Sequence, residues 1–108
     1  MNSNSPIDRL IHELRAFRDE RDWAQFHSPR NLAGSICIEA AELLEIFQWA
    51  DLKPPFNEEI RTRLRDEIAD VAIYLLLLSD QVEVDLIEAV NDKISKNRDR
   101  FKPSHQQV

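Results

Sequence analysis

Apolar residues recur at three- and four-residue intervals in four segments of the sequence, and each segment begins with a residue that commonly caps an α-helix. Serine followed by proline opens the first two segments, and proline fits the first helical position well. The expected helices cover residues 6 to about 22, 29 to about 50, 58 to about 81 and 86 to about 101. The pattern therefore predicts an all-α protein, a four-helix bundle that forms one domain over residues 1–108, with loose tails at 1–5 and 103–108.

The composition narrows the class further. A single glycine, Gly34, argues against an all-β fold rich in tight turns and against a Gly-rich phosphate loop. With 20 acidic and 14 basic residues the net charge is −6, which disfavours general nucleic-acid binding. One cysteine, Cys37, excludes an intrachain disulfide and a cysteine-based zinc site. The longest apolar run is too short to span a bilayer and no secretory signal is visible, so we expect a cytoplasmic protein without a membrane partner.

That apolar run, residues 71–78, surrounds the whole circumference of the third expected helix. A helix of a small monomer normally keeps one face in water, so this stretch should be covered on several sides. We therefore expect at least a homodimer. A central helix enclosed within a single bundle is the alternative.

Two pairs of acidic residues are spaced three apart, Glu39 with Glu42 and Glu67 with Asp70. Residues three apart project from the same face of a helix, and these acids have apolar neighbours that make burial costly unless a cation neutralises them. Carboxylates without histidine or cysteine favour Mg²⁺ or Mn²⁺ over zinc or copper. Solvated acidic faces are the alternative. Glu45, three residues further, is either a ligand, a supporting residue or plain surface.

The acidic motif, with residues 43–66 between its halves, resembles the signature of the all-α NTP pyrophosphohydrolase superfamily, the MazG-like enzymes. The flanking segments are most similar to the dCTP pyrophosphatase branch, and the likeness spans about residues 7–102. It is carried by residues 20–27 (ERDWAQFH), 29–32 (PRNL), 42–49 (ELLEIFQW) and 70–74 (DVAIY), with Lys93, Asn97 and Arg98. The resemblance implies a Mg²⁺-dependent homodimer or homotetramer that hydrolyses a nucleoside triphosphate to its monophosphate and pyrophosphate.

By position in the motif, the resemblance assigns the metal-ligand and catalytic role to Glu39, Glu42, Glu67 and Asp70. The residues that it implies for the nucleotide are Trp23, Trp49 and Tyr74 along the base, with His27 and Asn97 nearby, and Lys93 and Arg100 on the phosphates. Core packing of the aromatic residues and a solvated basic helix face are the alternatives. Leu14 stands where some relatives have histidine, which leaves the preference for cytosine open.

Two other classes of protein compete with this interpretation. A ferritin-like di-metal bundle needs histidine three residues after glutamate, and His12, His27 and His105 do not meet that spacing. A non-catalytic helical interaction module with solvated acids stays open. The absence of both Mg²⁺ binding and nucleotide turnover would favour the module.

Overall fold

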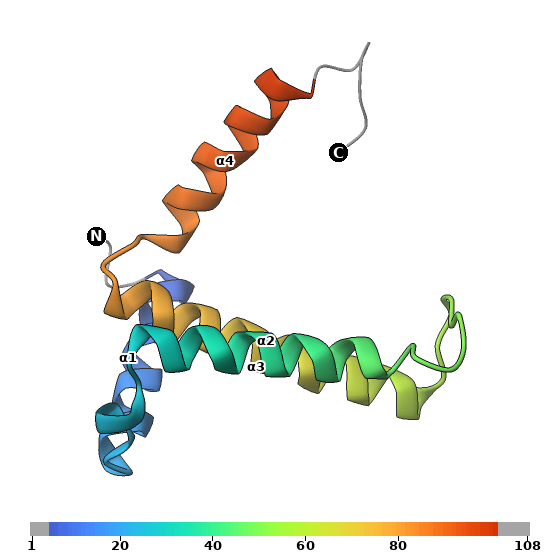
Figure 1. Cartoon of the computed structure of the whole chain (residues 1–108), viewed down its shortest axis with the longest axis horizontal. Helices are drawn as coiled ribbons and strands as arrows, with labels where there is room; N and C mark the ends of the chain where they lie inside the picture. The colour runs from blue at the N-terminus through green and yellow to red at the C-terminus, as the bar shows by residue number, and fades with distance from the viewer. Residues whose placement is uncertain (1–4, 102–108) are drawn as a thin grey trace.

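The computed structural model describes residues 5–101, and all of the regular structure within that range is helical (Figure 1). Its elements are α1 (Pro6–Glu20), a short 3₁₀ helix η1 (Trp23–Phe26), α2 (Pro29–Glu45), α3 (Glu58–Gln81) and α4 (Leu86–Arg100). The predicted all-α class and its four helices are confirmed. The expected tails lie outside the described residues, except that Ser5 caps α1.

Every α-helix begins directly after a residue that commonly caps helices. In each case the side-chain oxygen of the cap accepts the backbone N–H three residues further along the chain. The pairs are Ser5 with Asp8, Ser28 with Asn31, Asn57 with Ile60, and Asp85 with Glu88. Such a cap contributes about 1 kcal/mol, so four of them fix the starting points of the helices firmly.

Two helices end earlier than predicted. α1 stops at Glu20 because Asp22 takes a left-handed backbone conformation (φ 55°) and starts η1. α2 stops at Glu45, and the chain continues in tighter turns in which Ile46 and Gln48 donate to carbonyls three residues back. Turns of this kind satisfy the carbonyls that a helix end leaves free. The chain therefore remains coiled for a few residues after the α-helix has ended.

α2 and α3 lie side by side in opposite directions and form the main packed unit, and α1 crosses the end of that pair where α3 finishes (Figure 1). Leu32 near the start of α2 and Leu76 and Leu77 late on α3 are buried at this crossing. Arg15 of α1 also forms a two-point ion pair with Asp80 of α3, in which Nε lies 2.8 Å from Oδ2. The hydrogen bond from Arg15 lowers the pKa of Asp80 below its ordinary value.

A Schellman motif separates α3 from α4. Val84 donates its N–H to the carbonyl of Ser79 (2.8 Å) and Glu83 donates to that of Asp80 (3.2 Å). Glu83 therefore occupies the left-handed position (φ 59°) that usually holds glycine in this motif. The turn directs α4 away from the other helices.

α4 projects from the α2–α3 pair, and the described residues leave its apolar face about half exposed (Figure 1). Ile87, Val90 and Ile94 are 48%, 48% and 44% exposed. A single copy thus packs α1, α2 and α3 together, and the fourth helix of the expected bundle has no cover among residues 5–101. Within the same range, no helix combines the length and the apolar character needed to cross a membrane.

Candidate functional site

The two acidic pairs meet where α2 packs against α3. Glu39 of α2 and Glu67 and Asp70 of α3 each offer one carboxylate oxygen, and these three oxygens all lie within 4.8 Å of one another. Glu42, one turn after Glu39, is close enough for its carboxylate to influence the pKa of both Glu39 and Glu67. The antiparallel helix pair thus concentrates four acids in one place.

The surroundings of Glu39 and Glu67 disfavour their charged forms. The Oε2 atom of each is buried and has no hydrogen-bond partner among the described residues. Burial, reinforced by the neighbouring carboxylates, raises the pKa of Glu39 to about 7 from an ordinary value of 4.5. Burial and repulsion from Glu42 and Asp70 raise the pKa of Glu67 as well. Buried polar atoms normally find a partner, so these two oxygens indicate a missing positive group.

A divalent cation with a preference for oxygen fits this donor set. All of the clustered ligands are carboxylates, which suit hard cations such as Mg²⁺ and Mn²⁺. The cluster draws on both helices, so an ion there would also neutralise the repulsion across the α2–α3 interface. Glu45, whose role the sequence left open, is exposed at the last residue of α2 and is not one of the three clustered acids.

The candidate nucleotide residues are distributed more widely. Tyr74 follows Asp70 by one turn of α3 and is half-buried. Trp23 begins η1, and His27 precedes α2 with a buried Nδ1 that lacks a hydrogen-bond partner within residues 5–101. Trp49 lies beyond the other end of α2 and is 89% exposed.

The two tryptophans therefore flank opposite ends of α2. The helix between them has 17 residues, and a rise of about 1.5 Å per residue makes it roughly 25 Å long. A single base is far smaller than this separation. Within one copy of the chain, one base cannot stack on both indoles.

The candidate residues of α4 are also separate from the carboxylates. Lys93, Asn97 and Arg100 are spaced to share one face of α4, which projects away from α2 and α3. The guanidinium of Arg100 lies 4.9 Å from the centre of the Phe101 ring, at the far end of that helix. One copy of the chain brings the acids together but does not bring these three residues to them.

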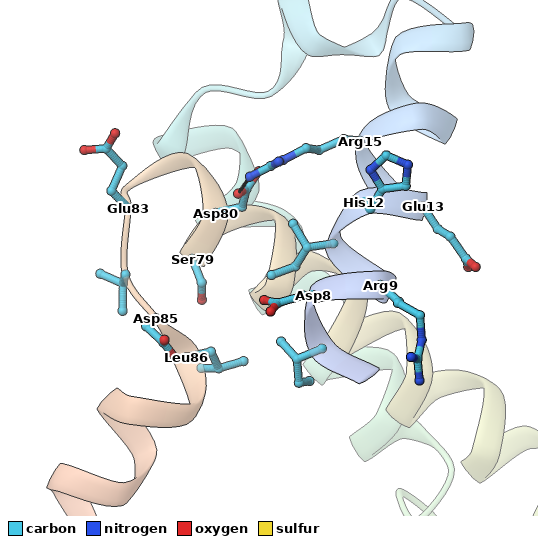
Figure 2. A pocket seen from close by; sticks show the side chains of 13 residues that line it. Asp8, Arg9, His12, Glu13, Arg15, Ser79, Asp80, Glu83, Asp85 and Leu86 are labelled. Carbon is cyan, nitrogen blue, oxygen red and sulfur yellow. Dashed lines mark hydrogen bonds and ion pairs between the residues drawn. The ribbon is translucent and has the colours of Figure 1, made fainter. Parts of the chain in front are cut away.

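A cavity of about 870 Å³ lies elsewhere, between the first half of α1 and the α3–α4 turn (Figure 2). Its described lining combines apolar residues with a polar edge that includes Asp8, His12 and the Arg15–Asp80 ion pair. None of the candidate site residues is part of that lining. The acidic cluster therefore lies outside this cavity.

The structure also draws attention to two residues that the sequence did not single out. Phe17 and Arg21 both contact Trp23 through ring and cation–π interactions. Both lie within the range expected for the first helix, where neither had been assigned a role. The four-residue spacing of Phe17 and Arg21, which makes them neighbours on a helix, is the signal that could have identified the pair.

Comparison with known proteins gives consistent matches. The model of the MazG-like family matches residues 35–107. dCTP pyrophosphatase 1 of Mus musculus is 44% identical and that of Homo sapiens 43%, in each case over 95% of this chain and 63% of the relative. The chain thus spans less than two thirds of the length of these relatives. A crystal structure of a pyrophosphatase from Archaeoglobus fulgidus is 43% identical, with a TM-score of 0.82 over 94% of this chain and 97% of that one.

Proposed function

The chain belongs to the MazG-like family, and we propose that it is a metal-dependent pyrophosphohydrolase that converts a deoxynucleoside triphosphate to its monophosphate and pyrophosphate. The observation that carries the proposal is the meeting of Glu39 and Glu67 across α2 and α3, each with a buried and unpartnered oxygen among the described residues. The relatives named dCTP pyrophosphatase 1 favour dCTP or a modified dCTP as the substrate. The biological role would then be to remove unwanted nucleotides from the pool.

The four carboxylates would hold Mg²⁺, with Mn²⁺ as a substitute. Bound there, the ion would attract the oxygens of the triphosphate and lower the pKa of a coordinated water. Without a cation the same acids repel an anionic substrate, so the chain's own residues make substrate binding dependent on the metal. Glu39, Glu42, Glu67 and Asp70 would each contribute a carboxylate oxygen.

In the proposed reaction, the oxygen of a water molecule forms a bond to the α-phosphorus. The bond from that phosphorus to the bridging oxygen breaks, and pyrophosphate leaves with the bonding electrons. One of the carboxylates accepts the proton of the water. The residues at the site need only orient the water in line with the leaving group and hold the proton.

The base would lie against aromatic residues. Trp23, Trp49 and Tyr74 offer stacking faces, and Asn97 and His27 offer hydrogen-bonding groups. Since one base cannot reach both indoles of one copy, we propose that a second copy of this chain supplies one of them. The uncovered apolar face of α4 supports the same assembly, a homodimer or a dimer of dimers.

In that assembly α4 would bring Lys93, Asn97 and Arg100 to the carboxylates of the partner copy. The positive charges of Lys93 and Arg100 would bind the phosphates, which the acidic chain otherwise repels. A mixing experiment tests this arrangement. Trp23→Ala and Trp49→Ala chains are refolded together in equal amounts. Activity is measured at a substrate concentration below the KM, where each variant alone should be weakly active.

Mixed dimers would contain one site with both indoles and one with neither. We therefore expect activity to recover to about one quarter of the wild-type level. Activity that stays at the mean of the two separate variants would contradict a shared site. Each variant refolded alone is the control.

The reaction itself is tested with a panel of triphosphates and Mg²⁺, in which pyrophosphate and orthophosphate are measured separately. The expected result is pyrophosphate release, fastest with dCTP or 5-substituted dCTP. Orthophosphate as the only product would contradict the proposed bond cleavage. Leu14 cannot donate a hydrogen bond, so the panel must include the other bases.

The alternative is a non-catalytic helical interaction module. The exposed apolar face of α4 is the observation that favours it. Calorimetric titration with Mg²⁺ separates the two candidates, because the module predicts neither heat of binding nor turnover. The buried acids favour the enzyme.

A further inference from the structure

Trp23 sits at a sharp change of direction in the backbone. Asp22 has φ 55°, and the 3₁₀ helix η1 begins with the next residue. The side-chain amide of Gln25 donates to the carbonyl of Asp22 (3.0 Å), which fastens this turn. The backbone thus presents Trp23 at the end of α1, where its side chain is 43% exposed.

Phe17 braces the indole from α1. The two rings have their centres 5.5 Å apart and an angle of 71° between their planes, which is a T-shaped contact. Such a contact involves the edge of one ring, so Phe17 covers at most one face of the indole. Phe17 itself remains about half exposed, and packing alone does not immobilise it.

Arg21 covers Phe17. Its guanidinium carbon lies 3.6 Å from the centre of the Phe17 ring and 5.7 Å from that of Trp23. The same guanidinium donates to the carbonyl of Phe17 (3.1 Å) and lies 3.4 Å from the carboxylate of Glu20. Arg21 is therefore held by one ring, one carbonyl and one carboxylate while it lies close to the indole.

We propose that Arg21, acting through Phe17, is a positioning residue that fixes the Trp23 indole with an open face for the nucleotide base. This inference rests on the proposed function, since Trp23 is assigned to the base there. A guanidinium keeps its charge at all working pH values, so the contact does not depend on pH. Fixing the ring before the base arrives removes an entropic cost of binding, and the gain appears in KM.

The first test needs no substrate. In a Trp49→Phe background Trp23 is the single tryptophan of the chain, so its fluorescence reports on that ring alone. Arg21→Ala should lower the anisotropy of Trp23 and increase its quenching by acrylamide, and Arg21→Lys should restore part of the effect. Unchanged anisotropy and quenching would overturn the proposal.

The second test uses turnover in the otherwise unaltered chain. Arg21→Ala should raise KM by about two- to fivefold, the size expected for an exposed cation–π contact, with kcat within about twofold. In a Trp23→Ala background the same substitution should raise KM no further. Loss of kcat alone, or an equal KM increase without Trp23, would overturn a positioning role.

Arg18→Ala is the matched control. Arg18 lies in the last turn of α1, three residues before Arg21, and pairs with Asp19 (2.8 Å). It should change neither the fluorescence of Trp23 nor KM, and an effect equal to that of Arg21→Ala would overturn the specific role of Arg21. If no triphosphate is hydrolysed at all, the proposed function fails, while the fluorescence test still decides whether Arg21 fixes the ring.

Discussion

Glu39 and Glu67 bring carboxylate oxygens within 4.8 Å of each other from two different helices, and each keeps one buried oxygen that no described residue hydrogen-bonds. Like charges at this distance oppose the packing of α2 on α3. A bound cation would reverse that effect. The proposed metal dependence, the pH dependence and the stability of the chain would therefore be linked at this contact.

Glu39→Gln should separate stability from activity. The substitution removes a charge that the folded state disfavours, so the metal-free variant should unfold at a higher temperature than wild type. Turnover should fall by about 100-fold or more because the charge that holds the cation is lost, and Mg²⁺ should no longer raise the unfolding temperature. Scanning calorimetry with and without Mg²⁺ and a pyrophosphate assay check this. Asp66→Asn, an exposed neighbour on α3, is the control.

The pKa of Glu39 predicts opposite pH trends for stability and for metal binding. Burial raises that pKa to about 7 from 4.5, so the folded state holds the proton more tightly than the unfolded chain. The stability of the metal-free protein should therefore decrease as pH rises from about 4.5 to about 7 and then level off, relative to Glu39→Gln.

Mg²⁺ affinity should increase over the same interval, by about tenfold per pH unit for each proton displaced. Chemical denaturation with a chelator and calorimetric titration with Mg²⁺ measure the two slopes. A Mg²⁺ affinity that does not change between about pH 5.5 and about pH 8 would contradict proton competition at these acids.

Trp49→Ala should affect binding without affecting folding. Its side chain is 89% exposed, so the unfolding temperature should stay unchanged. Loss of a base-stacking surface worth about 1–3 kcal/mol should raise KM by about 5- to 150-fold, with a smaller change in kcat. Steady-state kinetics decide this, and a change in kcat alone would contradict a stacking role.

Asp80→Asn should weaken the attachment of α1 to α3. Removing the two-point ion pair with Arg15 should cost about 1 kcal/mol, and Arg15→Gln should add little in the double variant. Because Arg15 lowers the pKa of Asp80 from 3.8, this stability is present above pH 3.8 and disappears as pH falls through the lower folded value. Urea denaturation checks both statements. Asp19→Asn, in a neighbouring surface pair, should leave stability unchanged.

Glu83→Gly should stabilise the chain. Glu83 has φ 59° at the position of the α3–α4 turn where glycine avoids steric strain. Glycine also makes the unfolded chain more flexible, which offsets part of the relief of strain. The free energy of unfolding should therefore rise by about 0.5–1 kcal/mol. Gln81→Gly, inside the last turn of α3, should instead cost about 1 kcal/mol. Thermal unfolding of both variants tests the contrast.

The starts of the helices could be predicted from the sequence because a cap is a local interaction. Ser5, Ser28, Asn57 and Asp85 each bond a backbone N–H only three residues away. The end of α3 at Gln81 was also predicted, but the ends of α1 and α2 were not. α1 ends before left-handed Asp22, and α2 passes into tighter turns after Glu45, and neither feature leaves an obvious mark in the residue pattern.

The sequence spacing places each acidic pair on one helix face, and the pairs meet because α2 and α3, joined by residues 46–57, pack in opposite directions (Figure 1). The position of α4 was not predictable. Val90 and Ile94 identify an apolar face but not the surface that covers it. The contact of Arg21 with Trp23 was missed because it depends on the reversal at Asp22.

In the proposed assembly, the apolar face of α4 would link the concentration of the chain to its activity. If that face is covered only when two copies associate, dilution exposes it and separates the basic residues of α4 from the acids that they would complement. Specific activity should then fall on dilution and recover on concentration. The abundance of the protein would in this way limit its own turnover, with no separate effector needed.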